Sequence, residues 1–447
     1  MMKISWIDIA ERINHELQQR EEEGNNVTEL RREWVRIENL HLGEEKFRSE
    51  AEEFYRKLEK TPSRVHNEGN EPTFWSEIVQ QCTITPDAVP SFTSSFVADR
   101  ILGGWLGRSA GCLLGKPIEK TPRSGVIELL SSNGTWPISE YITGRGIPDS
   151  LLQKYPWNRH NGKESLKENI ECMPEDDDLN YPMLNLSAYE RYGEALTSEH
   201  IIQTWLDLAP VLSTFTAERV AYVNRLTGLQ PPETAIVRNP YREWIGAQIR
   251  ADVWGWISPT QPARAAEFAW RDARLSHVRN GMYGEMFFAA AIAASFRSPD
   301  EKAVIHDALS FVPPHSRFAE AIRFVTSLPI QKQSWDATVD ALYAKFGTYH
   351  WVHTINNASL IVAALLSAKG DYERAICNVV MGGWDTDSNG ATVGSIMGTM
   401  LGAKNLPSKW ISPLNNKVRS SLKGFDHALL SDLANRTSKL AKYSPQH

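Results

Sequence analysis

The 447-residue chain has few cysteines, no excess of basic residues and no long hydrophobic run. Its four cysteines, at positions 82, 112, 172 and 377, form no CxxC or Cys/His ligand spacing. This excludes a zinc ribbon or a disulfide framework and predicts four free thiols. A net charge of −6 argues against nucleic acid as a partner. The most apolar run, 286–296, is too short to span a bilayer. No signal-peptide segment opens the chain, so we expect a soluble, cytoplasmic protein that does not bind membranes.

Strand-like alternation is also scarce, and no βαβ rhythm is present. Apolar residues instead recur at helical spacing through most of the chain. This pattern predicts an all-α protein with long connecting loops. Beyond residue 96 the expected helices are 97–115, 178–194, 197–225, 262–276, 281–296, 301–310, 316–327, 335–346, 357–368, 371–380, 388–403 and 412–435.

The first 95 residues differ in composition from the rest of the chain. Charged residues with apolar residues at helical spacing between Ile9 and Lys60 predict two or three amphipathic helices. Residues 61–90 read as a loop-rich linker. We therefore divide the chain into an N-terminal helical extension with its linker, residues 1–95, and a second domain, residues 96–447. The extension either docks on that domain or offers a surface to a partner. In residues 116–175 we expect a surface excursion.

Glycine recurs at every fourth position in two stretches, at 103, 107, 111 and 115 and at 390, 394, 398 and 402. Each glycine inside a helix costs roughly 1 kcal/mol relative to alanine, so two such stripes need a compensating contact. A spacing of four places the glycines on one helical face, where another backbone can approach closely. If the two helices pack antiparallel, Glu119 comes close to Asp385 and Asp387. The alternative is that each stripe packs against some other helix.

Acidic residues gather just before two of the expected helices. One group lies in PEDDDLNY and the other in WDTDS. Each group alone has a structural explanation, since acids cap helices and favour the N-terminal dipole. Brought together, they would raise one another's pKa values unless a cation were bound. Oxygen ligands without His or Cys suit Mg²⁺, Mn²⁺ or Ca²⁺ rather than zinc, and this donor set is large enough for two ions.

Four motifs in order make the chain resemble the ADP-ribosylglycohydrolase family, which includes the enzyme that reactivates dinitrogenase reductase. Between about residues 98 and 405 these motifs are GRSAGCLLGKPIE, then PEDDDLNY, then WIGAQIRADVWGW with LSHVRNGMYGEMFFAAAIAASF, then GGWDTDSNGATVGSIMG. The resemblance implies a compact, orthogonal multi-helix domain whose cleft holds a binuclear Mg²⁺ site, with Mn²⁺ as a substitute. It also implies hydrolysis of the bond between ADP-ribose and an acceptor such as arginine or serine.

The resemblance also implies roles for the acidic residues. The metal ligands it implies are Asp176, Asp177, Asp178, Asp385, Asp387 and Ser388. The family's Thr-Asp-Asp-Thr motif is Glu-Asp-Asp-Asp here, so either Asp176–Asp177 or Asp177–Asp178 takes the two central positions. Glu119, Asp177 and Asp178 are the catalytic candidates, one of which accepts the proton of the attacking water. Departures from the family pattern, such as Cys112 where aspartate is common, indicate a subgroup with its own acceptor.

The third motif is expected to hold the phosphates and the ribose of the substrate. The substrate-side candidates are Gly246, Ala247, Gln248, His277 and Tyr283. The first three would offer backbone N–H groups to pyrophosphate. Arg250 is either a phosphate partner or a structural arginine paired with Asp252. His277 either faces the substrate or has a purely structural role. Glu285 either favours a helix N-terminus or lines the cleft.

Together these features predict a Mg²⁺-dependent hydrolase that cleaves ADP-ribose from a protein side chain or a small molecule. The expected partner is therefore an ADP-ribosylated protein or an ADP-ribose-like small molecule. Two alternatives remain open from the sequence. One is an N-ribosyl hydrolase of a free nucleotide or nucleoside, since an oxygen-rich metal site suits any ribose diol. The other is a protein that binds ADP-ribose without turnover.

Overall fold

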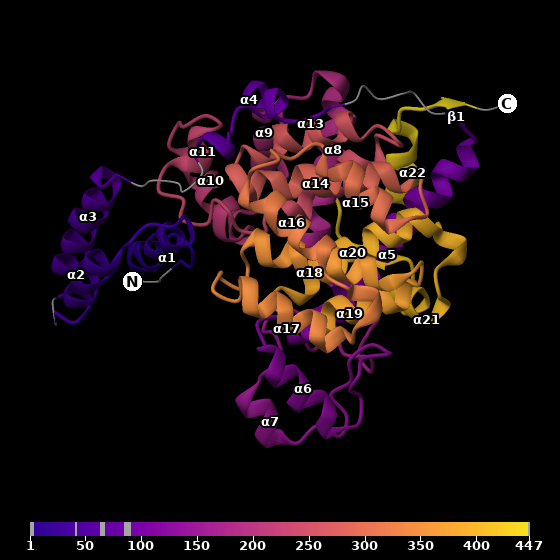
Figure 1. The fold of residues 1–447 in the computed structure, drawn as a ribbon, viewed down its shortest axis with the longest axis horizontal. Coiled ribbons are helices and arrows are strands. Elements are labelled where there is room, and N and C mark those ends of the chain that lie inside the picture. The colour runs from indigo at the N-terminus through magenta and orange to yellow at the C-terminus, as the bar shows by residue number, and fades with distance from the viewer. Residues whose placement is uncertain (1–3, 41–42, 63–67, 85–90, 446–447) are drawn as a thin grey trace.

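The computed structural model describes residues 4–40, 43–62, 68–84 and 91–445, and these fold almost entirely into helices. Figure 1 shows helices α1 to α3 at one end, the main helical body beside them, and α6 and α7 projecting from one side of that body. The strands within the described residues are two residues long and form two small two-stranded sheets. The all-α fold expected from the periodicity is therefore confirmed.

The helices before residue 200 are α1 (Ile9–Glu22), α2 (Thr28–Glu38), α3 (Glu44–Lys60), α4 (Trp75–Gln81), α5 (Ser94–Gly115), α6 (Arg123–Ser132), α7 (Asp149–Lys154), α8 (Asp177–Tyr192) and α9 (Ser198–Leu208). Those up to residue 330 are α10 (Thr216–Leu226), α11 (Glu233–Ile236), α12 (Asp252–Trp256), α13 (Pro262–Ala273), α14 (Arg279–Ser295), α15 (Glu301–Leu309) and α16 (Arg317–Ser327). The remainder are α17 (Trp335–Phe346), α18 (Thr354–Ala368), α19 (Tyr372–Met381), α20 (Thr386–Leu401), α21 (Ser408–Ile411) and α22 (Leu430–Leu440).

Short 3-10 turns and strands complete the chain. The turn that follows α5, η2 (Lys116–Ile118), and the turn that precedes α12, η5 (Gln248–Arg250), both lie close to the site described below. Strand β1 (Ser91–Phe92) pairs in parallel with β4 (Ser444–Pro445), which joins the two ends of the main body. Strand β2 (Lys417–Val418) pairs antiparallel with β3 (Ala428–Leu429).

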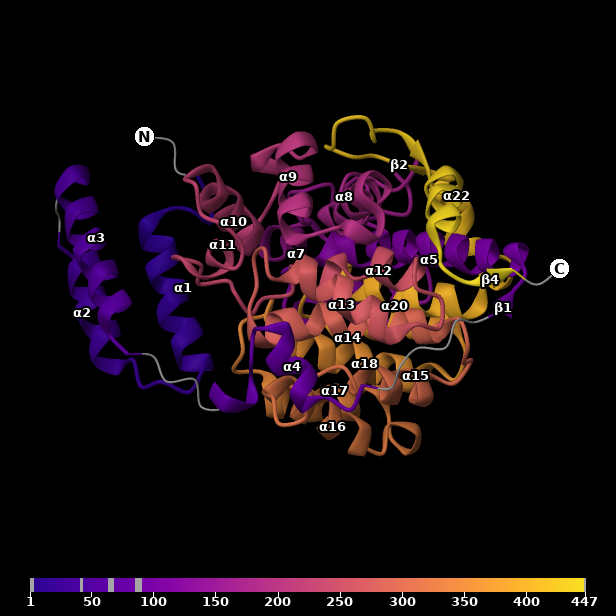
Figure 2. The same ribbon diagram turned by 90° about the horizontal axis from the view of Figure 1, so that it is seen from above.

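Helices α14, α18 and α20 form the centre of the main body. Every residue of α18 is buried, as is nearly every residue of α14 and α20. Helices buried on all sides need no polar face, which explains why these sequences are apolar or small throughout. Seen from above in Figure 2, α5 and α20 lie alongside each other beneath α12 and α13. Within the described residues, none of the helices combines the length and hydrophobicity needed to cross a bilayer.

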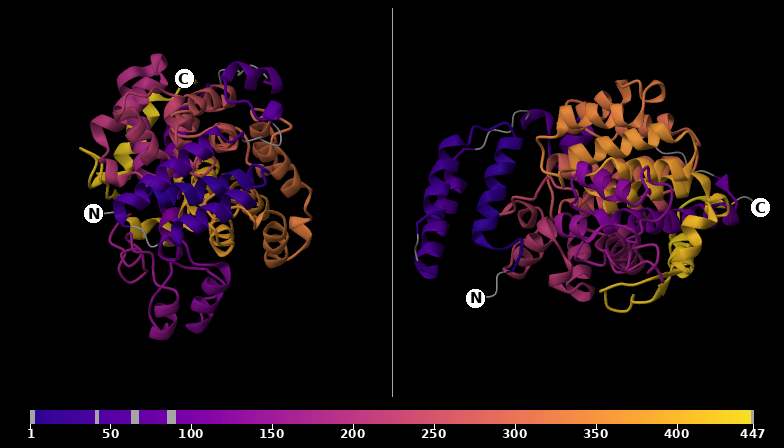
Figure 3. Two further views of the ribbon diagram at one scale, coloured as in Figure 1. Left: turned by 90° about the vertical axis from the view of Figure 1, so that its left-hand side faces the viewer. Right: turned by 90° about the horizontal axis from the view of Figure 1, so that it is seen from below.

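Helices α1 to α3 have a small apolar core of their own, built on Leu17, Trp34 and Phe54. Figure 3 shows these indigo helices beside the main body, with α1 nearest to it. Charged groups join α1 to the body, because Arg242 pairs with Glu16 at 2.6 Å and with Glu23 at 2.9 Å. Helix α4 instead contributes Ile78 to the main core. The docked form of the extension is thus the one present here, while the division at residue 95 stays a prediction.

Two expected helices differ from the structure. The predicted helix 197–225 is two helices, α9 and α10, separated around Pro210, which cannot continue an α-helix. The predicted helix 412–435 is wrong over most of its length, since only α22 is helical beyond residue 414. Pro413 and Gly424 interrupt that segment, and Gly424 has φ of +85°. The excursion 116–175 is partly ordered by α6 and α7 and buries Val126 and Leu130.

Candidate functional site

The two glycine stripes face each other along α5 and α20, which run antiparallel. A Cβ atom added to Gly107 would overlap the carbonyl oxygen of Gly394, and one added to Gly111 would overlap that of Gly390. At the end of this contact the Thr386 hydroxyl donates to the Gly115 carbonyl at 2.8 Å. The predicted packing is therefore confirmed, and its direction brings the end of α5 to the start of α20.

This packing places three carboxylates together. Oxygen atoms of Glu119, Asp385 and Asp387 all lie within 4.8 Å of one another. Asp385 occupies the N-cap position of α20 but makes no side-chain cap hydrogen bond, so capping does not explain it. Burial, with the neighbouring Asp387, raises the pKa of Asp385 well above its ordinary value. Burial and Asp387 likewise raise the pKa of Glu119 to about 7. This crowding of acids is the arrangement that a bound cation relieves.

Lys116 lies in the middle of these acids, which the sequence analysis did not anticipate. Its ammonium group contacts Asp176 and lies 3.0 Å from Asp387 Oδ2 and 3.7 Å from Glu119 Oε2. Burial alone would lower the pKa of Lys116, but Asp176 and Asp387 outweigh that effect and raise it well above its ordinary value. Lys116 in turn holds the pKa of Asp387 low against the effect of burial. The signal was available in the GKPIE motif, three residues before Glu119.

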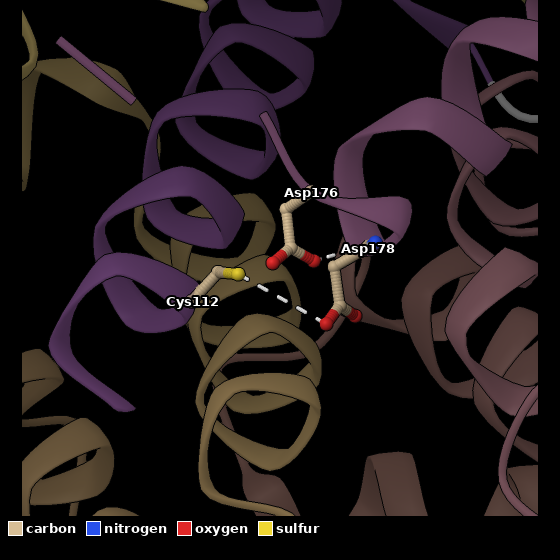
Figure 4. Close-up of side chains that lie close together, drawn as sticks. All are labelled: Cys112, Asp176 and Asp178. Carbon is tan, nitrogen blue, oxygen red and sulfur yellow. Dashed lines mark hydrogen bonds between the residues drawn. The ribbon is translucent and has the colours of Figure 1, made fainter. Parts of the chain in front are cut away.

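A second acid group stands beside the first, and its ligand atoms are already engaged. It consists of Cys112, Asp176 and Asp178 (Figure 4). Asp176 caps α8, because its Oδ1 accepts the N–H of Asp178 at 2.9 Å. Asp178 pairs with Arg108 at 3.0 Å and accepts the Ser388 hydroxyl at 3.1 Å. Burial, followed by the charge of Asp176, raises the pKa of the Cys112 thiol, which keeps it neutral and a poor metal ligand.

The first acid group lines a pocket, here called the carboxylate pocket. Its polar lining residues are Lys116, Glu119, Lys120, Asp177, Glu218, Asp385, Asp387 and Ser388. Its aromatic lining residues are Trp6, His160, Phe215, Trp244 and Trp351. The cavity measures about 90 Å³. A ribose-sized group at the acids would therefore have aromatic side chains beside it.

A larger cavity, of about 730 Å³, lies elsewhere, between α1 and the pair α16 and α17. Its lining mixes acids such as Glu21 with the cations Arg31, Arg317 and Lys345. None of the site residues expected from the sequence is among its lining residues. Size alone therefore does not identify the site, and the grouping of carboxylates favours the smaller carboxylate pocket.

The predicted substrate-side residues are only partly at this pocket. Gly246 lines it, and a Cβ there would overlap the Glu218 carboxylate, so glycine makes room for that acid. Ala247 and Gln248 are fully buried behind it, and the Gln248 side chain accepts from Thr354 at 3.2 Å. Neither of them is among the lining residues.

His277 and Tyr283 lie in the buried core and are not among the residues that line the pocket. His277 Nδ1 lies 2.8 Å from the Ser276 hydroxyl. Burial, with the charge of Arg250, lowers the pKa of His277 well below its ordinary value, so the ring is neutral. The Tyr283 hydroxyl donates to the carbonyl of Pro72. The structure therefore does not bring these two side chains together with the acids.

Arg250 is a structural arginine, but the prediction that it pairs with Asp252 is wrong. It pairs with Glu218 at 2.8 Å, with Asp272 at 3.1 Å and with Glu285 at 3.5 Å. Asp252 instead pairs with Arg108 at 2.7 Å. Glu285 is fully buried beside Arg250 and accepts from the Trp254 indole at 3.1 Å, so it does not line the cleft.

A family model identifies the family to which this chain belongs. The family model described as ADP-ribosylglycohydrolase matches residues 93–444. A solved structure described as an "ADP-ribosylglycohydrolase-related protein complex" aligns with 17% sequence identity over 78% of this chain and 99% of that chain, with a TM-score of 0.48. No curated protein matches the sequence. The family match spans both glycine-striped helices and both acid groups, and it leaves out α1 to α4.

Proposed function

The chain belongs to the ADP-ribosylglycohydrolase family, and from this premise we propose that it is a divalent-cation-dependent hydrolase of ADP-ribosyl bonds. Its substrate is an ADP-ribosyl group joined to an acceptor, either a protein side chain such as arginine or serine or a small molecule. The observation that carries the proposal is the meeting of Glu119 with Asp385 and Asp387 at the carboxylate pocket. Glu119 precedes Asp385 by 266 positions (385 − 119), and the α5–α20 contact brings the two together.

The three carboxylates fit a hard cation. They offer only oxygen atoms, and the buried Asp387 Oδ1 has no hydrogen-bond partner among the described residues. Such donors suit Mg²⁺, with Mn²⁺ as a substitute. When bound there, the ion would supply positive charge that orients the ribose hydroxyls and polarises a water molecule.

The second acid group fits a further cation poorly. Asp178 already accepts from Arg108 and from the Ser388 hydroxyl, Cys112 is a neutral thiol, and Asp176 faces the ammonium of Lys116. We therefore assign one divalent ion to Glu119, Asp385 and Asp387, with Lys116 providing the second positive charge. The resemblance implied two ions, and a count of bound ions decides between the two numbers.

The protein's own residues divide the remaining work. Glu119 retains 13% exposure and is held by Asn158 and Lys120, with Lys120 Nζ at 3.3 Å. Glu119 is therefore in reach of solvent, and we propose that it acts as the general base that accepts a proton from the attacking water. The water oxygen bonds to the anomeric carbon, the bond to the acceptor breaks, and the acceptor leaves with a proton. Asp177 lines the pocket and remains the alternative base, whereas the Arg108 pair gives Asp178 an orienting role.

The position of Asp176 favours one register of the acidic motif. Asp176 is the N-cap of α8, a position for which threonine is also a preferred residue. We therefore align Asp176 with the first threonine of the family's Thr-Asp-Asp-Thr motif, which puts Asp177 and Asp178 in the two central positions.

The test is release of free ADP-ribose from arginine-linked and serine-linked ADP-ribosyl proteins, with Mg²⁺ and with EDTA. We expect release only with Mg²⁺, and loss of it in the double variant Asp385→Asn/Asp387→Asn. Asp340→Asn is the matched control, because Asp340 is an exposed carboxylate whose ion pair with Arg123 lies on the surface.

Three other results would contradict the proposal. Cleavage of free nucleotides alone would make the protein an N-ribosyl hydrolase. Binding of ADP-ribose without turnover of any substrate would make it a binding protein. Full activity of the double variant would show that Asp385 and Asp387 are not the site.

A further inference from the structure

One side of the carboxylate pocket comes from outside the family match. Of the described residues that line the pocket, Trp6 alone lies outside residues 93–444. Trp6 belongs to the short segment before α1, so the N-terminal extension reaches the candidate site. The other aromatic residues there, such as Phe215, Trp244 and Trp351, belong to the main body.

The segment that carries Trp6 is fixed by polar contacts at its backbone. The Trp6 N–H donates to Glu11 Oε2 at 2.6 Å, and the Ser5 carbonyl accepts from Arg219 at 3.1 Å. Trp6 itself has φ of +70°, which is uncommon for a bulky residue and is maintained only where its surroundings enforce it. These contacts together turn the indole toward the pocket.

Among the described residues, the rings around Trp6 leave its indole without a parallel stacking partner. Its contacts with His15, Tyr241 and Trp244 have interplanar angles of 41°, 88° and 79°. Trp244, by contrast, stacks on His350 with centroids 4.2 Å apart and an angle of 8°. Trp6 is also only half-buried. Its indole can therefore still accept a flat ring, whereas one face of Trp244 is already occupied.

We propose that Trp6 is a specificity-determining residue, whose indole stacks on a planar ring carried by the substrate. This inference rests on the proposed function. If the carboxylates hold the ribose next to the scissile bond, the rest of an ADP-ribosyl group lies along the pocket, and its base is the planar ring available. The N-terminal extension then selects ligands that carry a base over ligands that carry only a sugar phosphate.

The cavity is small for a whole ADP-ribosyl group. At about 90 Å³ it is below the roughly 300–1,000 Å³ of pockets that enclose drug-sized ligands. Helix α1 is anchored by the pairs that Glu16 and Glu23 make with Arg242, so it stays docked. The enclosed space therefore suits the ribose, and the half-buried Trp6 would meet the base where the ligand leaves the cavity.

Calorimetric titration of the full-length protein in Mg²⁺ tests the inference with two probes, ADP-ribose and ribose 5-phosphate. The second probe has the ribose and a phosphate but lacks the base. Trp6→Ala is expected to weaken ADP-ribose binding about tenfold or more, the usual effect of losing one base–aromatic stack, and to leave ribose 5-phosphate unchanged. Trp6→Phe keeps a ring and should retain most of the affinity. Phe74→Ala, at an aromatic residue with 54% exposure outside the pocket lining, is the control.

Each other outcome refutes a different statement. If the wild-type protein binds ADP-ribose and Trp6→Ala binds it equally well, the role of Trp6 is wrong and the proposed function stands. If Trp6→Ala binds ADP-ribose more tightly, Trp6 covers the site and does not select its ligand. Equal weakening of both probes would mean that the variant distorts the pocket. If the wild-type protein binds neither probe, the proposed function fails, and this inference fails with it.

Discussion

Replacing Lys116 by methionine tests whether an ammonium group takes the place of a metal ion. The side chain of Lys116 is 3% exposed, and its ammonium contacts Asp176 and lies 3.0 Å from Asp387. Removing one partner of a buried ion pair costs about 3–5 kcal/mol, because the charge left behind is unpaired. We therefore expect Lys116→Met to lose about that much free energy of unfolding in EDTA. The measurement is urea unfolding followed by tryptophan fluorescence.

Lys120→Met is the matched control, since it makes the same change four residues away. Lys120 pairs with Glu119 at 3.3 Å, but its side chain is 56% exposed. Pairs of that kind contribute about 0–1 kcal/mol. If Lys116→Met is no less stable than Lys120→Met in EDTA, the central position of Lys116 has no energetic consequence and our reasoning is wrong.

Adding Mg²⁺ makes the same comparison specific to the ion. In Lys116→Met the carboxylates of Asp176 and Asp387 lose their ammonium partner, so we expect the variant to bind Mg²⁺ more tightly than the wild-type protein. An ion that binds only the folded state stabilises it by about 2.7 kcal/mol at a concentration 100 times its Kd. Mg²⁺ should therefore stabilise Lys116→Met by more than it stabilises the wild-type protein. Two ions bound to the wild-type protein in a titration would refute this assignment.

Two further perturbations test the packing that supports the site. In Gly107→Ala the new Cβ would overlap Gly394, which should lower the free energy of unfolding by about 1–3 kcal/mol. The higher helix propensity of alanine offsets roughly 1 kcal/mol of that loss. Gly69→Ala is the control, because no atom lies within 4 Å of its new Cβ, and it should change little in urea unfolding. Burial would raise the pKa of Glu243, but Arg317, followed by Arg279, holds it well below its ordinary value. The stabilisation from Glu243 is therefore complete above the pKa of an unfolded glutamate and is lost as the pH falls through the lower folded value. Gln19 of α1 donates to Glu243 at 2.8 Å, so the protection of α1 amides against hydrogen exchange should stay high down to about pH 4. Arg317→Met should move the onset of lost protection to higher pH. Equal stability of the two glycine variants, or an onset that does not move, would contradict these expectations.

The contact between α5 and α20 was predictable because its signal is local and periodic. Four glycines at intervals of four are unfavourable in a solvated helix and favourable where two backbones touch, so their spacing alone predicts a close helix pair. The antiparallel direction was not fixed by the spacing and entered only as the condition under which Glu119 meets Asp385 and Asp387. The structure pairs Gly107 with Gly394 and Gly111 with Gly390, so the two helices run antiparallel.

Ion pairs were less predictable, because a buried charge selects its partner in three dimensions. Asp252 is two residues from Arg250 and was the obvious partner in sequence, yet Arg250 pairs with Glu218 and Asp272. Asp252 instead forms an ion pair with Arg108, which belongs to a helix more than 140 positions earlier. The false helix 412–435 has a related cause. Its apolar spacing suited a helix, but Pro413 and Gly424 outweigh spacing where the backbone must turn.

Lys116 and Trp6 show why the carboxylate pocket could be only half predicted. The acids were recognisable, because several carboxylates in two short motifs are unusual without a cation. A lysine or a tryptophan has no such signature, since most lysines are solvated and most tryptophans pack in a core. The two residues also affect different components of the site: Lys116 affects the cation, and Trp6 affects the ligand. Lys116 reduces the negative charge available to a second cation, and Trp6 narrows the space available to the rest of the ligand. We therefore expect changes at Lys116 to alter ion binding and changes at Trp6 to alter the choice of ligand, and the Lys116→Met and Trp6→Ala variants test these two positions separately.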